Sequence, residues 1–295
     1  MNILNKFNIS ICIITYKRVD DCIECVESLI QSINFSKNDE ILILNNDTSS
    51  KELSKKYERD KKVKVYDSEK NSGVAEGRNK LVSLSKNNNL FFIDDDAILK
   101  KVNLKKRLLS ILKNNKIRVI AVKSLNYYSG NINRNEIPNY NKKNFYCSNF
   151  IGVGHFFYKD DFLKFGGYDN SFFYGMEEFD YSYHVLKNDG MIFYTESITV
   201  LHKKNPEGRI SDKNVLLNQA LNKTKLAANH LPKFFIFSHK LLWFIKLRFK
   251  HHLKYNIINH FYIKTNPKTK KIFFYKYFLF YFKFNFNPFY SVNET

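Results

Sequence analysis

The chain has 295 residues, 44% of them hydrophobic, so it can bury a substantial core, which excludes global disorder. Its formal net charge of +20 is distributed unevenly along the chain, because no acidic residue occurs between Asp212 and Glu294. A strongly cationic second part indicates an acidic partner: a membrane surface, a nucleic acid or an acidic substrate.

The four cysteines do not indicate a disulfide framework. Cys22 and Cys25 have CxxC spacing, but no second cysteine pair or HxxxH run accompanies them. We therefore expect both to be packing residues on a helix, in a reduced, cytoplasmic protein. Residues 1–9 have neither a long apolar segment nor a small-residue cleavage site, so we expect no signal peptide.

Predicted strands and helices alternate through the first part of the chain. Short apolar runs predict strands, and apolar residues every three or four positions predict helices. The predicted strands are Ile9–Ile14, Ile41–Leu44, Val63–Tyr66 and Leu90–Ile93, and the helices between them are Asp20–Ile33, Ser50–Arg59 and Val74–Ser85. This alternation is typical of a doubly wound α/β fold with a parallel sheet.

Polar segments follow three of these strands directly. They are Thr15–Arg18, Asn45–Thr48 and Asp94–Asp96. Ligands of such sheets bind at the carboxyl ends of the strands, so we expect the three segments to converge on one edge. Burying three adjacent carboxylates costs free energy through desolvation and mutual repulsion. Such a cluster is stable if it stays in contact with water or if a cation lies among its oxygens. The convergence favours a Mg²⁺ or Mn²⁺ site over a solvated acidic turn.

After residue 100 the same patterns continue. They predict a helix over Asn103–Lys113, a flexible polar loop over Asn126–Asn144, and strands over Ile117–Lys123, Phe150–Tyr158, Met191–Thr195 and Ile198–Leu201. A second acidic cluster, Glu177, Glu178 and Asp180, stands where another helix begins. The helix dipole favours acidic residues in a first turn, which is the simplest explanation. The aromatic residues around the cluster favour a functional role, because partly apolar surroundings turn a carboxylate into a useful proton acceptor.

Taken in order, these motifs resemble glycosyltransferase family 2, the inverting nucleotide-sugar glycosyltransferases with the GT-A fold. The resemblance extends over about residues 8–203. Its pieces are Thr15–Arg18, Asn71-x-Gly73-x-x-x-Gly77-Arg78-Asn79, Phe92–Ala97, Gly166–Asp169, Gly175-x-Glu177-Glu178-x-Asp180 and His202. It implies a GT-A domain over residues 1–205, with a Rossmann-like, mostly parallel sheet flanked by helices, followed by a basic and aromatic helical region over 206–295.

The resemblance also implies a role for each motif residue. The implied nucleotide-sugar-binding residues are Thr15, Tyr16, Arg18, Asn46, Arg78, Asp94 and Asp95. The implied ligands of Mg²⁺ or Mn²⁺ are Asp94, Asp96 and His202. Glu178 is the implied catalytic base, with Glu177 and Asp180 shaping its environment or binding acceptor hydroxyls.

Two positions depart from the family pattern. Asn45 stands where the family often has Asp, and His184 stands where the acidic motif usually continues to Arg. We therefore expect the contacts at these two positions to differ from those of the family.

The cationic region after Asp212 contains Lys-rich aromatic segments, which are Phe234–Phe237, Leu241–Ile245 and Ile272–Phe286. None provides the ~18–20 uninterrupted apolar residues of a membrane-spanning helix. Their composition suits the interface of an anionic membrane. Capping of the catalytic domain or a homodimer contact is the alternative. Nucleic-acid binding is not expected, because no recognised module is present.

The sequence therefore predicts a metal-dependent enzyme that moves a sugar from a nucleoside-diphosphate sugar to a glycan or lipid-linked glycan in surface polysaccharide assembly. We expect it at the inner face of the cell membrane. One alternative is a non-catalytic nucleotide-sugar-binding or membrane scaffold protein with the same fold. A nucleotidyltransferase is disfavoured, because no Gly-rich basic loop follows the first strand.

Overall fold

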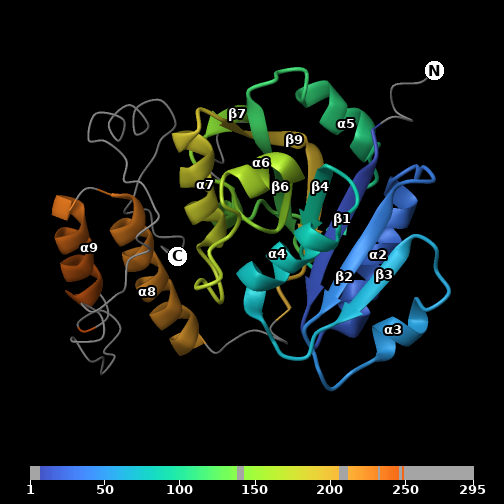
Figure 1. Cartoon of the computed structure of the whole chain (residues 1–295), viewed down its shortest axis with the longest axis horizontal. Helices are drawn as coiled ribbons and strands as arrows, with labels where there is room; N and C mark the ends of the chain where they lie inside the picture. The colour runs from blue at the N-terminus through green and yellow to red at the C-terminus, as the bar shows by residue number, and fades with distance from the viewer. Residues whose placement is uncertain (1–6, 138–142, 206–211, 232, 246–247, 249–295) are drawn as a thin grey trace.

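The computed structural model describes residues 7–137, 143–205, 212–231, 233–245 and 248. Within them the strands form one mixed sheet with helices on both faces (Figure 1). In spatial order the strands are β3 (Val63–Asp67), β2 (Glu40–Asn45), β1 (Ile9–Thr15), β4 (Asn89–Ile93), β8 (Gly154–Tyr158), β6 (Ile117–Asn126), β9 (Met191–His202) and β5 (Ala97–Leu99); β7 (Asn144–Cys147) pairs with β9.

The first four strands of the chain are parallel, as predicted. β1 lies between β2 and β4, and β2 pairs with β3. The register aligns Thr15 with Asn45 and Asn45 with Asp67, so the polar strand ends lie side by side. β6 and β9 are also parallel, whereas β8 is antiparallel to β4 and β6, and β5 and β7 are antiparallel to β9.

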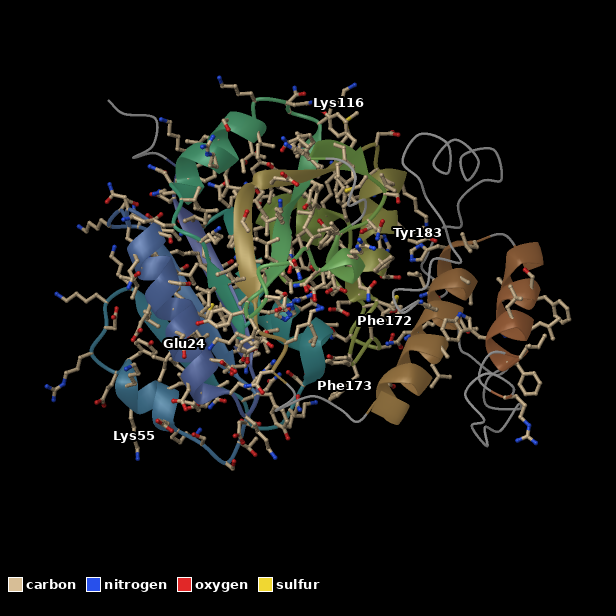
Figure 2. All side chains as sticks on the ribbon, turned by 180° about the vertical axis from the view of Figure 1, so that it is seen from behind. Glu24, Lys55, Lys116, Phe172, Phe173 and Tyr183 are labelled. Atoms are coloured by element: carbon tan, nitrogen blue, oxygen red, sulfur yellow. The ribbon has the colours of Figure 1, made fainter. Side chains whose placement is uncertain are left out.

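Both faces of the sheet are apolar, which is why β1 reads as a continuous apolar run. Alternate residues of β1 belong to opposite cores: Ile11 and Ile13 to one, Cys12 to the other. The first core includes residues of α2 (Val19–Ser32), α3 (Glu52–Lys56) and α5 (Leu104–Ile111), and the second includes residues of α4 (Gly73–Leu84), α6 (Lys159–Lys164) and α7 (Glu177–Lys187). Figure 1 shows α4, α6 and α7 in front of the sheet, and Figure 2 shows α2 from behind.

Cys22 and Cys25 are fully buried on α2, where both contribute to the first core. They are free thiols. Their spacing places both on the buried face of an amphipathic helix, so packing accounts for these two residues.

The structure differs from the predicted elements in several places, including the strands β5 and β7, which were not predicted. β8 begins only at Gly154, because the preceding residues turn toward α4, where Gly152 O accepts a hydrogen bond from Arg78. The loop over 126–144 contains a short 3-10 helix, η1 (Arg134–Glu136). The two strands expected between residues 191 and 201 form the single strand β9, whose register against β6 shifts between Val122 and Lys123.

The described part of the C-terminal region contains α8 (Asp212–His230) and α9 (Lys233–Ile245), which lie side by side (Figure 1). Tyr183 of α7 packs with Leu226, Ala227 and Leu231 in a small apolar cluster. Figure 2 shows Tyr183 and Phe172 on the side of the domain that faces α8. α8 is therefore docked on the α/β domain.

Among the described residues, no helix is both long enough and apolar enough to cross a bilayer. The predicted aromatic segment Ile272–Phe286 lies outside the described residues.

Candidate active site

A pocket of about 620 Å³ lies at the carboxyl ends of β1, β2 and β4. Its lining contains most of the residues that the sequence singled out: Tyr16, Arg18, Asn46, Arg78, Asp94, Asp95, Asp96, Glu177 and Glu178. Three others, Thr15, Asp180 and His202, are not among the described lining residues. Residues of both acidic clusters therefore line one cavity.

Arg78 joins the two acidic clusters. Its Nη1 lies 2.9 Å from Glu177 Oε1 and 3.0 Å from Glu178 Oε1, and its Nη2 lies 3.3 Å from Asp94 Oδ1. Nη2 also donates to the carbonyl oxygen of Gly152 at 3.3 Å. The guanidinium is buried, and its planar set of donors suits several acceptors at once. Carboxylates from the end of β4 and the start of α7 are thus held around one cation.

The two adjacent glutamates have different environments. Glu177 is buried, and its Oε2 has no hydrogen-bond partner among the described residues. Burial and the neighbouring Glu178 carboxylate raise the pKa of Glu177 well above its ordinary value, against the opposing effect of Arg78. The Glu178 side chain is 12% exposed and lines the pocket. Glu177 is therefore the deeply buried member of the pair, and Glu178 is the carboxylate that faces the pocket.

Gly152 leaves room for this arrangement. A Cβ atom at this position would lie within 3.0 Å of Glu178 Oε1 and of both terminal nitrogens of Arg78. The bend before β8 therefore brings the backbone of Gly152 directly against the ion pairs that Arg78 forms with Glu177 and Glu178.

A group of three possible metal ligands lies beside Arg78. One ligand atom from each of Asp94, Asp96 and His202 falls within 4.8 Å of the others. Asp96 follows β4 and His202 ends β9, and pairing of Ala97 with His202 brings these segments together. Two carboxylates and one imidazole suit Mn²⁺ or Mg²⁺, which favour oxygen ligands and share them with phosphates. The donor set therefore fits the metal that the sequence predicted.

His202 is oriented by a residue that sequence reasoning missed. His202 Nδ1 lies 3.0 Å from Glu136 Oε1, and His202 Nε2 lies 3.1 Å from Asp96 Oδ1. Burial alone would lower the pKa of an imidazole, but the two carboxylates outweigh it and raise the pKa of His202 to about 10. Ser124 and Lys204 contact Glu136 as well. A buried carboxylate behind the imidazole is the usual support of a metal-binding histidine.

Arg18 holds the remaining two carboxylates of the triplet. Its Nη2 lies 2.8 Å from Asp95 Oδ1, and its Nη1 lies 2.8 Å from Asp96 Oδ2. Burial raises the pKa of Asp95 to about 7, with Arg18 opposing the shift and Asp96 reinforcing it. All three aspartates after β4 are therefore paired with arginine, Asp94 with Arg78 and the other two with Arg18.

The pocket wall includes backbone in sparsely populated conformations. Lys17, after β1, has φ 60°, and Met176, before α7, has φ 79°. Residues other than glycine rarely adopt these backbone φ values, and such strain is concentrated at binding and catalytic sites. Gly73 also has a positive φ, and a Cβ there would meet the carbonyl oxygen of Phe173. The segments after β1 and before α4 and α7 are thus shaped around the cavity.

The amides of Asn45, at the end of β2, and Asn46, just after it, hold neighbouring loops. Asn46 donates to the carbonyl oxygen of Gly73 at 3.3 Å and accepts from Ser72 at 3.1 Å. Asn45 donates to Asp67 Oδ1 at 2.9 Å. An aspartate at position 45 would face Asp67 with a like charge, which gives a physical reason for the departure from the family pattern.

The remaining two sequence candidates make contacts outside the pocket lining. Thr15 is buried, and its Oγ1 lies 3.5 Å from the carbonyl oxygen of Arg18. Asp180 faces His184 and His230, the latter from α8. The acidic motif therefore points Glu177 and Glu178 into the pocket and Asp180 toward α8.

Several solved glycosyltransferase structures have folds similar to that of this chain. GalNAc-T7, determined with UDP, GalNAc and Mn²⁺, superposes with a TM-score of 0.62 at 17% identity, over 84% of this chain and 52% of that one. TarS from S. aureus gives 0.56 at 13% identity, over 89% and 46%. The mannosyltransferase PcManGT from Pyrobaculum calidifontis, determined with GDP-Man and Mn²⁺, gives 0.57 at 11% identity, over 76% and 64%. The chain spans about half the length of the first two.

The chain thus has the GT-A fold of these glycosyltransferases. Residues 10–175, more than half of the chain, match the family model described as "Glycosyl transferase family 2", and the chain belongs to this family. A protein of Haemophilus influenzae described only as uncharacterized is 29% identical over 167 residues, which is 52% of this chain and 89% of that protein.

Proposed function

We propose that this glycosyltransferase is metal-dependent and inverting, and that it moves a sugar from a nucleoside-diphosphate sugar to a hydroxyl of a glycan or lipid-linked glycan. The observation that carries the proposal is the position of Arg78, which contacts Asp94 of one acidic cluster and Glu178 of the other. Because both clusters line one pocket, a metal-bound diphosphate and a proton acceptor would lie on either side of one reacting sugar.

Each group then has a defined role. Glu178 removes the proton from the acceptor hydroxyl while the new bond forms between that oxygen and the anomeric carbon. The bond from the anomeric carbon to the diphosphate oxygen breaks, and the electron pair leaves with the nucleoside diphosphate. A divalent ion held by Asp94, Asp96 and His202 would neutralise charge on the diphosphate. A single displacement with the base opposite the leaving group inverts the anomeric carbon.

The donor class is supported by the ligands of the structural relatives. TarS was also solved with UDP, GalNAc-T7 with UDP, and PcManGT with GDP-Man. Tyr16, Arg18 and Asn46 stand at the carboxyl ends of β1 and β2, where a nucleotide would lie in such a sheet.

Replacement of Glu178 by Gln tests the catalytic assignment. We expect Glu178→Gln to lower turnover by ~10²- to 10⁴-fold, because the amide cannot accept the proton. Donor binding, followed by thermal shift with a panel of UDP-, dTDP- and GDP-sugars and Mn²⁺, should remain near wild type. Turnover equal to wild type would contradict the role of Glu178. Donor binding without transfer by the wild type would favour a non-catalytic sugar-nucleotide-binding protein.

We further propose that the C-terminal region binds the anionic inner face of the cell membrane. On α9, Phe237, Leu241, Leu242 and Ile245 are exposed, by 65%, 41%, 53% and 43%. The sequence around them is rich in lysine, and no acidic residue occurs between Asp212 and Glu294. Exposed apolar side chains flanked by cations suit a negatively charged bilayer surface.

Flotation of the full-length chain with vesicles tests this second proposal. The chain should float with vesicles containing phosphatidylglycerol, float less at high salt, and remain behind with vesicles of phosphatidylcholine alone. Leu241→Asp should weaken flotation, because it adds a charge to the exposed apolar face. A wild-type chain that never floats, or that is dimeric through α9, would reject membrane binding.

A further inference from the structure

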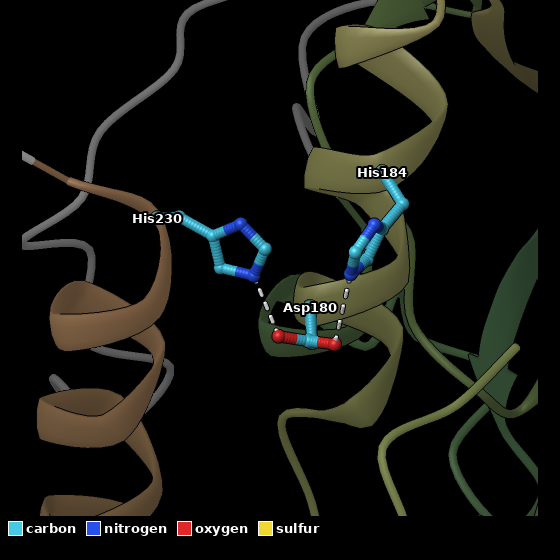
Figure 3. A group of neighbouring side chains, drawn as sticks. All are labelled: Asp180, His184 and His230. Carbon is cyan, nitrogen blue, oxygen red and sulfur yellow. Dashed lines mark hydrogen bonds and ion pairs between the residues drawn. The ribbon is translucent and has the colours of Figure 1, made fainter. Parts of the chain in front are cut away.

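A second group of potential metal ligands lies outside the pocket, between α7 and α8 (Figure 3). It consists of Asp180 and His184, one helical turn apart on α7, and His230 at the end of α8. One ligand atom from each residue lies within 4.8 Å of the other two. Asp180 Oδ1 lies 2.6 Å from His230 Nε2, and Asp180 Oδ2 lies 3.6 Å from His184 Nε2.

The separations can be compared with those around a tetrahedral ion. With zinc–ligand bonds of about 2.0–2.2 Å, two ligand atoms of a tetrahedron lie about 3.3–3.6 Å apart. The 3.6 Å between Asp180 Oδ2 and His184 Nε2 falls within this range, and side-chain rotations of Asp180 and His230 would lengthen the 2.6 Å contact between them to reach it. Asp180 and His230 are buried, and the partly exposed His184 lies on the solvent side, where an ion could enter.

The surroundings fix the ring of His230. It stacks on Tyr183 with a centroid separation of 4.5 Å, and its Nδ1 lies 2.7 Å from Lys187 Nζ. This directs Nε2 toward Asp180, as Figure 3 shows.

We propose that Asp180, His184 and His230 bind one Zn²⁺ ion, with a water molecule as the fourth ligand, and that this ion fastens α8 to α7. Two imidazoles and one carboxylate favour zinc over Mg²⁺, whereas the more oxygen-rich Asp94, Asp96 and His202 group does not share this preference to the same degree.

The ion would join α8 to the helix that begins with the glutamate pair. Asn222 of α8 already donates to the carbonyl oxygens of Tyr174 and Gly175, at 3.0 and 2.8 Å, just before α7 begins. A zinc ion one turn further along α7 would fix a second point of the same contact. The inference does not depend on the sugar-transfer proposal, because it concerns different side chains.

Zinc titration of the full-length chain tests this site. Protein freed of metal with a chelator is titrated with ZnCl₂ in excess Mg²⁺, which competes at Asp94 and Asp96, and bound zinc is measured by calorimetry and by elemental analysis. We expect one zinc per wild-type chain, at least tenfold weaker binding in His184→Ala, and near-wild-type binding in the control His202→Ala. No zinc binding by the wild type, or equal affinity in His184→Ala, would overturn the proposal.

Thermal unfolding provides a separate readout. Zinc should raise the Tm of the wild type and of His202→Ala but leave that of His184→Ala unchanged, because a ligand stabilises only the state that binds it. Should His184→Ala fail to fold without zinc, His184→Gln replaces it, since this position is partly exposed and tolerates a polar side chain. A zinc-induced rise in Tm as large as that of the wild type, in His184→Ala or in His184→Gln, would contradict the site.

Discussion

The guanidinium of Arg78 lies 3.0 Å from Glu178 Oε1 and is buried beneath the pocket. The same group contacts Glu177 and Asp94, so three carboxylates depend on it for neutralisation. Arg78 therefore stabilises the fold and positions the proposed base at once.

Arg78→Met is expected to destabilise the protein by about 3–5 kcal/mol, because it leaves buried carboxylates without a counter-charge. Turnover should fall as well, since Glu178 loses the partner that fixes its position. Urea unfolding followed by circular dichroism measures the first effect. The matched control is Arg118→Met: Arg118 is more exposed and pairs with Asp161 at 3.1 Å, and its loss should change stability by at most ~1 kcal/mol. Equal stability changes in the two variants would contradict the role given to Arg78.

Glu136→Gln should weaken Mn²⁺ binding by ~10- to 100-fold, the usual effect of removing the carboxylate behind a metal-binding histidine. The amide can occupy the same space, but it no longer favours the imidazole orientation that the carboxylate selects. Mn²⁺ affinity is measured by electron paramagnetic resonance of the free ion. Glu196→Gln is the control, because Glu196 pairs with Lys123 at 3.0 Å away from the metal ligands. Unchanged affinity in Glu136→Gln would show that His202 does not need this support.

Gly152→Ala should reduce turnover strongly, because the added methyl group would displace either Glu178 or Arg78. Steady-state kinetics of sugar transfer, or of donor hydrolysis, reports the loss. Gly130→Asn is a suitable comparison: it has nothing within 4 Å of a Cβ, and asparagine tolerates its φ of 69°. Wild-type kinetics in Gly152→Ala would mean that the ion pairs of Arg78 with Glu177 and Glu178 can rearrange without loss of turnover.

Asn45→Asp is expected to destabilise the protein by about 1–3 kcal/mol, because it replaces a donated hydrogen bond to Asp67 by two facing carboxylates. The double variant Asn45→Asp, Asp67→Asn should recover most of the loss, since it restores one amide opposite one carboxylate. Chemical unfolding at pH 7 gives both values. No recovery in the double variant would mean that the pair does not account for the effect.

Stability should fall as the pH drops from about 6.5 to about 4, in part through His230. Burial lowers the pKa of His230 to about 4, although Asp180 opposes the shift. In this window the unfolded chain binds a proton at His230 and the folded chain does not, so acid favours unfolding. Asp180 acts at lower pH, because its own pKa is depressed by His184 and His230 despite burial.

The comparison that isolates His230 is the metal-free wild type against His230→Gln. The variant should lose less stability across this pH window, measured by urea unfolding at each pH. Buried His155 also has a lowered pKa and contributes in the same direction, so the wild-type slope should decrease without vanishing. Identical slopes in the two proteins would contradict the assignment to His230.

Much of the fold followed from local patterns. The apolar run over residues 9–14 and the helical repeat over 20–33 predicted β1 and α2, because a strand buried on both faces and an amphipathic helix each have a distinctive period. The place of the pocket also followed, since the carboxyl ends of neighbouring parallel strands meet at one edge.

The contacts within the site depended on the tertiary structure. No local signal joins Glu136 to His202, or Gly152 to Arg78, because each pair meets only when distant segments pack together. The direction of Asp180 was also undetermined, since a helix that starts with three acidic residues can turn any of them toward a partner. The sequence by itself determined which residue types stand at the strand ends. Which carboxylates face the pocket, and which one faces α8, was decided by how α7 packs between the sheet and α8, because helix rotation is set by tertiary packing.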